Sequence, residues 1–142
     1  NNWDNTYKIS SSIGNKIHYL KSKILDKHGL GSSFETRKFI KFIKEYDPDV
    51  IHLHNIHGYY LNYKILFKFL QTYKGKILWT MHDMWPCTGI CHHARECDKY
   101  HKECHHCPYL YNGGAKKDLS HQTFKKKKEL YQAELLIKLC IN

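Results

Sequence analysis

The stretch PDVIHLHN at positions 48–55, together with KILWT at positions 76–80, decides the fold of this chain. Both runs are short, rich in β-branched and large apolar residues and bounded by turn formers, which predicts buried strands over residues 49–55 and 76–80. Between them, residues 61–73 place apolar side chains at helical spacing, and Gly75 ends that segment. A strand, a helix and a strand in about 32 residues predict a βαβ unit with parallel strands and a right-handed crossover.

Further helices are predicted on both sides of this unit. From Lys16 onward, an apolar stripe predicts a helix that Gly29 and Gly31 end, because glycine tolerates the left-handed cap conformation. Ser33 is a plausible N-cap for a second helix, which stops before Pro48. A last helix is predicted over residues 119–139. Alternating helices and strands indicate an α/β fold built on a parallel sheet.

Length and composition limit the class of protein. The chain has 142 residues, enough for one domain or for part of a larger one, and no apolar run approaches the roughly 20 residues that cross a bilayer. No signal-peptide core opens the sequence, so we expect a soluble, cytoplasmic segment. The formal charge of +10 favours anionic partners such as phosphates, nucleic acid or a membrane surface.

Polar side chains follow both predicted strands at the point where each strand ends. His54, Asn55 and His57 follow the first strand, and His82 and Asp83 follow the second. In an open parallel sheet, ligands bind at the carboxyl ends of the strands, so this rim is a candidate site. The alternative is that Asn55 and Asp83 only cap helices or satisfy backbone groups.

A stretch rich in cysteine and histidine, residues 84–110, interrupts the alternation. Cys91, Cys97, Cys104 and Cys107 have the spacing C-x5-C-x6-C-x2-C, and four thiolates suit a structural, tetrahedral Zn²⁺. Plain reduced thiols and disulfides are the alternatives, the latter less expected in a reducing compartment. Five histidines in the same stretch could compete as metal ligands: His92, His93, His101, His105 and His106. Two further cysteines, Cys87 and Cys140, lie outside the tetrad.

Two long segments carry a resemblance to a known family. Residues 48–70 and 79–110, with the signature W-T-x-H-D-x-W-P-x-T-G-x-C followed by C-x6-C-x-x-C-P, closely resemble the N-terminal domain of bacterial family-4 glycosyltransferases. These are GT-B-type enzymes that assemble capsule, exopolysaccharide and lipopolysaccharide sugars, including the colanic-acid-type group. The likeness runs from about residue 13 to about residue 128.

The resemblance implies a Rossmann-like acceptor-side domain that works with a second domain binding a nucleotide-sugar donor. It implies that His82 is the catalytic residue and lines the cleft near the transferred sugar, with Asp83 beside it as a substrate-binding residue. His54, Asn55 and His57 would face the cleft or the acceptor, a glycan or a lipid-linked sugar at the inner membrane face. The family's four cysteines align with the tetrad.

Departures from the family predict an incomplete domain. The glycine-rich loop after the family's first strand and the whole donor domain have no counterpart in residues 1–142, and Cys87 stands where the family has an aromatic residue. After Tyr131 the sequence no longer follows the family, which would continue into another strand. We therefore expect a partial Rossmann-like sheet with flanking helices, and a glycosyltransferase fragment that is inactive alone.

Two other functions compete with this one. The charge, the cysteine cluster and the run from Lys125 to Lys128 suggest a small zinc-stabilised nucleic-acid-binding module. Against it, the cysteines follow a βαβ unit and match no zinc-finger spacing with a recognition helix behind it, so we expect no nucleic-acid partner. The third possibility is a folded remnant without activity.

Overall fold

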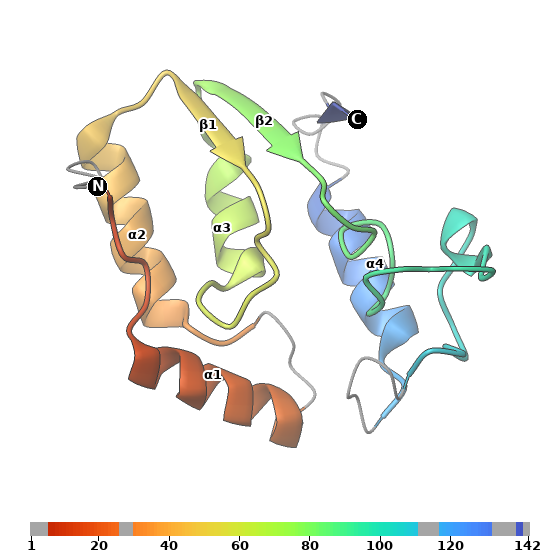
Figure 1. Cartoon of the computed structure of the whole chain (residues 1–142). Helices are drawn as coiled ribbons and strands as arrows, with labels where there is room; N and C mark the ends of the chain where they lie inside the picture. The colour runs from red at the N-terminus through yellow and green to blue at the C-terminus, as the bar shows by residue number, and fades with distance from the viewer. Residues whose placement is uncertain (1–5, 26–29, 111–116, 132–138, 141–142) are drawn as a thin grey trace.

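The computed structural model describes residues 6–25, 30–110, 117–131 and 139–140 (Figure 1). Its elements, in chain order, are α1 (Ser12–Leu25), α2 (Ser33–Tyr46), β1 (Val50–Leu53), α3 (Tyr63–Leu70), β2 (Lys76–Thr80), the 3₁₀ turn η1 (Lys99–His101), α4 (Ser120–Tyr131) and β3 (Leu139–Cys140). The fold is mixed α/β with a small parallel sheet, as the sequence predicts.

The predicted βαβ unit is confirmed. β1 and β2 pair in parallel, with Val50 opposite Lys76 and Leu53 opposite Trp79, and α3 connects them. On the other side of β2, the short β3 pairs in parallel, with Leu139 opposite Trp79. The described strands therefore lie in the order β1-β2-β3. All three run the same way, so their carboxyl ends share one edge.

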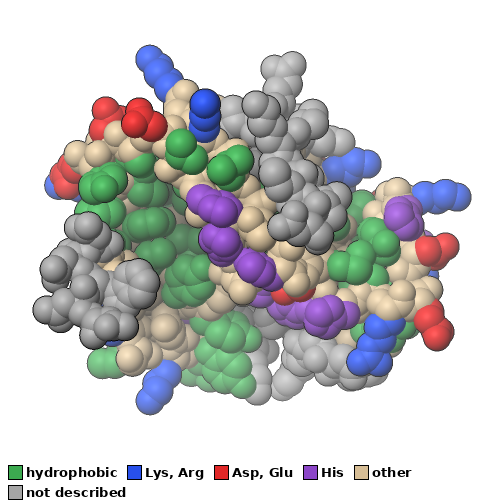
Figure 2. Space-filling view, turned by 45° about the horizontal axis from the view of Figure 1, so that its top comes forward, with side chains coloured by type: hydrophobic (Ala, Val, Ile, Leu, Met, Phe, Trp, Pro, Cys, Tyr) green, Lys and Arg blue, Asp and Glu red, His purple; other side chains and the backbone are tan. Residues whose placement is uncertain are grey.

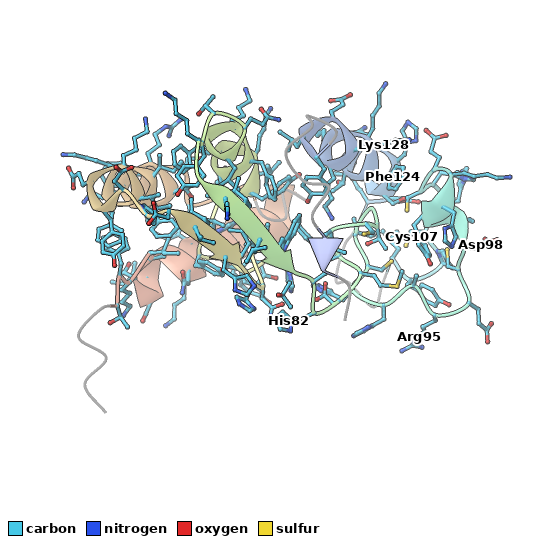
Figure 3. The ribbon with its side chains drawn as sticks, turned by 90° about the horizontal axis from the view of Figure 1, so that it is seen from above. His82, Arg95, Asp98, Cys107, Phe124 and Lys128 are labelled. Carbon is cyan, nitrogen blue, oxygen red and sulfur yellow. The ribbon has the colours of Figure 1, made fainter. Side chains whose placement is uncertain are left out.

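One face of the sheet carries the core. Leu53 and Trp79 are buried and pack with Phe67 of α3, and α3 and α4 lie on this side of the sheet (Figure 3). Strand side chains alternate between the two faces, so Leu78, next to Trp79, and Val50, three positions before Leu53, lie on the other face, where they are 37% and 45% exposed. The sheet is thus covered on one face and partly open on the other.

Helix α1 differs from the prediction in its start and in its packing. It begins at Ser12, before the first residue with clear periodicity, and its apolar residues Ile17 and Leu20 are 49% and 57% exposed. Among residues 12–20 of α1, whose side chains the structure describes, His18 is the buried one, and it accepts a hydrogen bond from Gly31 N–H at 2.9 Å. A Cβ on Gly31 would lie within 2.2–2.6 Å of the His18 ring. Gly31 therefore permits this close approach and does not cap α1, which ends at Leu25, while Gly29 lies outside the described residues.

The ends of the other helices test the predicted boundaries. Helix α2 stops where predicted: Asp47, in the left-handed conformation, donates its N–H to Ile43 O at 2.9 Å. Its N-cap is Ser32 rather than Ser33. The prediction that the last helix reaches residue 139 is wrong, because α4 ends at Tyr131 and residue 139 belongs to β3. Residues 132–138 of that prediction lie outside the described residues.

The loop after β1 is held against α2 by one buried side chain. Asn62 donates from Nδ2 to Leu30 O at 2.6 Å, and its Oδ1 accepts Ile65 N–H at 3.1 Å as the N-cap of α3. Its own N–H donates to Thr36 Oγ1 at 2.8 Å. These bonds fix the far end of the segment that carries His57. None of the helices in the described part of the chain is long and apolar enough to cross a membrane.

Candidate functional site

The structure brings the ends of β1 and β2 together at one rim. His54 follows β1, His82 lies two residues beyond β2, and His54 Nδ1 is 2.9 Å from His82 Nε2. Figure 3 shows His82 beyond the arrowhead of β2. Parallel pairing explains this contact, because it places both carboxyl ends at the same edge. The hydrogen bond requires one ring nitrogen to donate and the other to accept.

The pair extends into a row of histidines along the open face of the sheet. His52 Nε2 lies 2.8 Å from Thr80 Oγ1, and the His52 and His54 rings are 4.2 Å apart. Histidine side chains gather in a row across this face of the molecule (Figure 2). Local desolvation and then the neighbouring imidazoles of His52 and His82 lower the pKa of His54. The neutral form of His54 is therefore favoured at physiological pH.

Asp83 is the centre of a second group on the rim. Its Oδ2 lies 3.2 Å from His57 Nε2 and 3.0 Å from His92 Nδ1, while its Oδ1 accepts Trp85 N–H at 2.9 Å. The His57 and His92 rings meet edge to face at 4.7 Å. The Asp83 and His57 side chains are only 14% and 18% exposed, whereas that of His92 is 46% exposed. Two imidazoles thus converge on one carboxylate oxygen.

Burial and hydrogen bonding act in opposite directions on this carboxylate. Burial raises the pKa of Asp83, but the hydrogen bonds from His92 and from Trp85 N–H outweigh it and hold the pKa below its usual value. Burial also lowers the pKa of His57, and the attraction of Asp83 only partly offsets this. Asp83 is therefore an anion at neutral pH, and His57 is biased toward its neutral form.

His92 is a member of this group that the rim prediction missed. The segment 84–92 closes on itself, since Met84 N–H donates to His92 O at 2.8 Å and Thr88 Oγ1 donates to Cys91 O at 2.5 Å. This closure returns His92 to Asp83, nine positions earlier in the chain. The sequence marks His92 only as one of several histidines near the cysteines, so its place on the rim follows from the loop closure alone.

Lys127 anchors the same loop from helix α4. Its Nζ donates to the carbonyl oxygens of Trp85, Thr88 and Gly89 at 2.6, 3.1 and 3.3 Å, and it lies 3.5 Å from the Trp85 ring centroid. The side chain is 1% exposed. Burial lowers the pKa of Lys127 to about 7. One lysine of the 125–128 run is therefore structural, which weakens the case for that run as a nucleic-acid-binding surface.

Asn55, the remaining predicted rim residue, lies outside both groups. Its side chain is exposed, and its backbone carbonyl accepts the Tyr60 hydroxyl at 2.5 Å. The structure therefore places Asn55 as part of the turn after β1. Its predicted contact with substrate stays a prediction.

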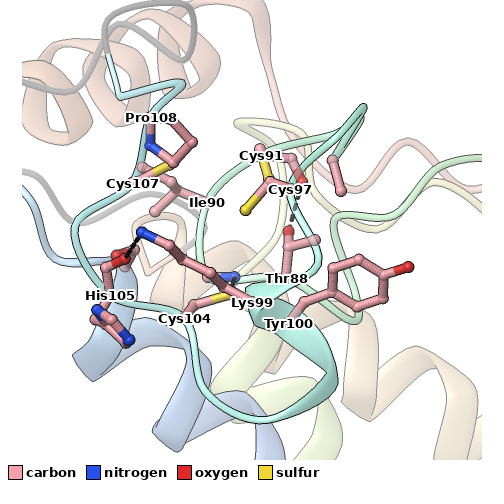
Figure 4. A pocket seen from close by; sticks show the side chains of 13 residues that line it. Thr88, Ile90, Cys91, Cys97, Lys99, Tyr100, Cys104, His105, Cys107 and Pro108 are labelled. Carbon is pink, nitrogen blue, oxygen red and sulfur yellow. Dashed lines mark hydrogen bonds between the residues drawn. The ribbon is translucent and has the colours of Figure 1, made fainter.

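The cysteine tetrad lines one pocket beside the rim (Figure 4). Cys104 is buried and accepts Gly89 N–H on its sulfur at 3.3 Å, and Cys91, Cys97 and Cys107 are partly buried around it. Burial, then repulsion from the other thiols, raises the pKa of Cys104. The described cysteines are all free thiols, and Cys87 is exposed. The side chain of Cys140 lies outside the described residues.

The tetrad and the Asp83 group differ in how closely their ligand atoms approach. Within the described ranges, His57, Asp83 and His92 are the one set of three or more potential ligands whose ligand atoms all lie within 4.8 Å of one another. Four sulfurs bound to one zinc ion would each lie about 2.3 Å from it. The thiols have the right chemistry and share a pocket, but zinc binding would require their sulfurs to draw together.

Comparison with known proteins gives one curated relative. The chain is 33% identical over 96 residues to the "Putative colanic acid biosynthesis glycosyl transferase WcaC" of Escherichia coli (strain K12). The alignment covers 63% of this chain and 24% of that protein, so the chain spans about a quarter of the relative's length. No protein-family model matches the chain, and no solved structure matches it. The aligned part of the chain is glycosyltransferase-like in sequence.

Proposed function

We propose that the chain is the acceptor-side, Rossmann-like part of a GT-B-type glycosyltransferase of family 4. The enzyme would transfer a sugar from a nucleotide-sugar to a glycan or lipid-linked acceptor in surface polysaccharide biosynthesis, at the inner face of the membrane. The similarity to the E. coli protein and the βαβ unit with a polar rim support this proposal. The net charge of +10 suits phosphate-bearing donors and an anionic membrane surface.

The observation that carries the proposal is the pairing of His54 with His82 at the carboxyl ends of two neighbouring strands. Ligands of open α/β sheets bind at this edge. His54 fixes the orientation of the His82 ring through Nε2, which leaves His82 Nδ1 for a sugar hydroxyl. The ionised Asp83 adds a hydrogen-bond acceptor for hydroxyl groups on the same rim.

The proposal also includes a structural zinc ion bound by Cys91, Cys97, Cys104 and Cys107. Their shared pocket and their thiol chemistry support it. Within residues 84–110 the regular secondary structure is the short 3₁₀ turn η1. Zinc would draw this loop together and hold it beside the rim. The rim residues themselves bind and orient substrate without it.

A substitution at His82 tests the catalytic role. In an intact relative that carries the same W-T-x-H-D rim, replacing the histidine that corresponds to His82 by alanine should lower turnover far more than it lowers the melting temperature. The histidine that corresponds to His93, which is exposed here, gives the matched control. Turnover that stays within about threefold, under 1 kcal/mol of barrier, would show that His82 is only a structural residue.

A further inference from the structure

We propose that His57, Asp83 and His92 form a binding site for a divalent transition-metal ion, distinct from the cysteine tetrad. The ligand atoms are His57 Nε2, Asp83 Oδ2 and His92 Nδ1, and they all lie within 4.8 Å of one another. The proposal stands on this geometry and does not depend on the glycosyltransferase function.

The donor set indicates the class of ion. Two imidazole nitrogens and one carboxylate oxygen suit zinc, iron(II), cobalt(II) and nickel(II), whereas calcium and magnesium prefer oxygen ligands alone. Three protein ligands leave at least one coordination position for water or for an oxygen of a substrate, as in catalytic zinc sites. The tetrad, by contrast, would be a closed site of four sulfurs.

The scaffold holds two of the three ligands in place without a metal. Trp85 N–H fixes the Asp83 carboxylate at 2.9 Å, and the Trp85 ring lies 5.4 Å from the His57 ring. Lys127 in turn holds the Trp85 carbonyl at 2.6 Å. Second-shell contacts of this kind orient metal ligands and increase metal affinity.

His92 completes the group from the far end of the closed segment 84–92. Its backbone carbonyl accepts Met84 N–H at 2.8 Å, so the residue returns to the Asp83 side chain from the far end of the segment 84–92. Its side chain is 46% exposed, which leaves a path for an ion and for exchange of the bound water. The competing explanation is that two imidazoles simply donate N–H groups to one carboxylate, with no ion involved.

Counting bound zinc separates these explanations. The 142-residue chain would be equilibrated with Zn²⁺ by dialysis, and the zinc retained per chain measured by elemental analysis for the wild type, His92→Ala and Asp83→Asn. Each variant should lose one zinc ion per chain. Asp83→Asn keeps an oxygen that can accept Trp85 N–H, and His92 is exposed enough to be replaced with little disturbance of the fold.

Two matched controls identify which site holds the ion. His93→Ala removes an exposed neighbouring histidine and should lose no zinc. Cys104→Ser removes a ligand of the tetrad, and adding His92→Ala to Cys104→Ser should lower the zinc content by one further ion per chain. If His92 were instead a ligand of the tetrad, Asp83→Asn would keep the zinc content of the wild type and His92→Ala would remove no further zinc from Cys104→Ser, which would overturn the proposal.

Cobalt gives an independent readout. Bound Co²⁺ with nitrogen and oxygen ligands has visible d–d absorption but no thiolate-to-metal charge transfer, so the spectrum lost in His92→Ala should lack that charge-transfer band. Equal metal content in the wild type and in His92→Ala, including none in both, would also overturn the proposal. No nucleotide-sugar is present in these measurements, so their result is separate from that of the turnover test at His82.

Discussion

Histidines 54 and 82 meet because their strands pair in parallel, which places both imidazole rings at one edge of the sheet. Each histidine follows a short run that reads clearly as a strand, and a βαβ connection allows only parallel pairing of such neighbours. The same argument foresees that Asp83 lies on the rim. It does not foresee His92 or Lys127, because these reach the rim through the closure of an irregular loop and through the docking of α4.

Lys127 leads to a prediction for the pH dependence of stability. The amine has an ordinary pKa of 10.5 in the unfolded chain, and burial lowers it to about 7 in the folded one. Between these values the unfolded chain binds more protons, so the free energy of unfolding should rise with pH. The side chain of Lys127→Met does not titrate. Relative to this variant, the free energy of unfolding of the wild type should rise by on the order of 5 kcal/mol at most between the two pKa values.

Urea denaturation of both proteins at several pH values from 7 to 9.5 measures this difference. Lys127→Met also removes the donor to three carbonyl oxygens, which contributes a loss of stability that does not depend on pH, typically about 1–3 kcal/mol. The test is the slope of the free energy of unfolding against pH, because a constant difference between the two proteins does not change this slope. Parallel profiles for the two proteins would contradict a lowered pKa at Lys127.

At the level of elements, the differences from the sequence prediction have two physical causes. The apolar stripe of α1 shows which residues share a helix face, but it does not show what covers that face, and Ile17 and Leu20 are largely exposed. The C-terminal apolar run fits a helix or a buried strand equally well by periodicity. Pairing with β2 decides between them at residues 139 and 140, and pairing is a tertiary contact that a local pattern does not contain.

The loop that carries the tetrad allows a prediction for its cysteines. If the four thiolates bind one zinc ion, Cys104→Ser or Cys107→Ser should lower the bound zinc by one ion per chain, whereas Cys87→Ser and Cys140→Ser should leave it unchanged. Metal should also be lost as the pH falls, because protons compete with zinc for the sulfurs. Elemental analysis of the four variants beside the wild type measures this. An equal zinc content in all four would leave the tetrad as ordinary thiols.

At the scale of the whole molecule, the prediction concerns catalysis by these 142 residues alone. We expect no sugar transfer above background when the chain is incubated with nucleotide-sugars and lipid-linked acceptors. The departing diphosphate needs preorganised positive groups, which the second domain supplies in enzymes of the proposed type. Release of nucleoside diphosphate that depends on the acceptor is the measurement. Turnover that His82→Ala abolishes would show that these residues suffice.

The anchoring of the rim by Lys127 has a consequence for the order in which the protein assembles on the ribosome. Trp85 and Lys127 are 42 positions apart in the chain, so the carbonyl groups of the 85–89 turn are synthesised well before their donor. The βαβ unit can pair its strands before α4 has left the exit tunnel, since its contacts are local in sequence. The rim cannot take its final shape until α4 docks. Nascent chains that stall before residue 127 would therefore carry β1 paired with β2 but an unfinished site.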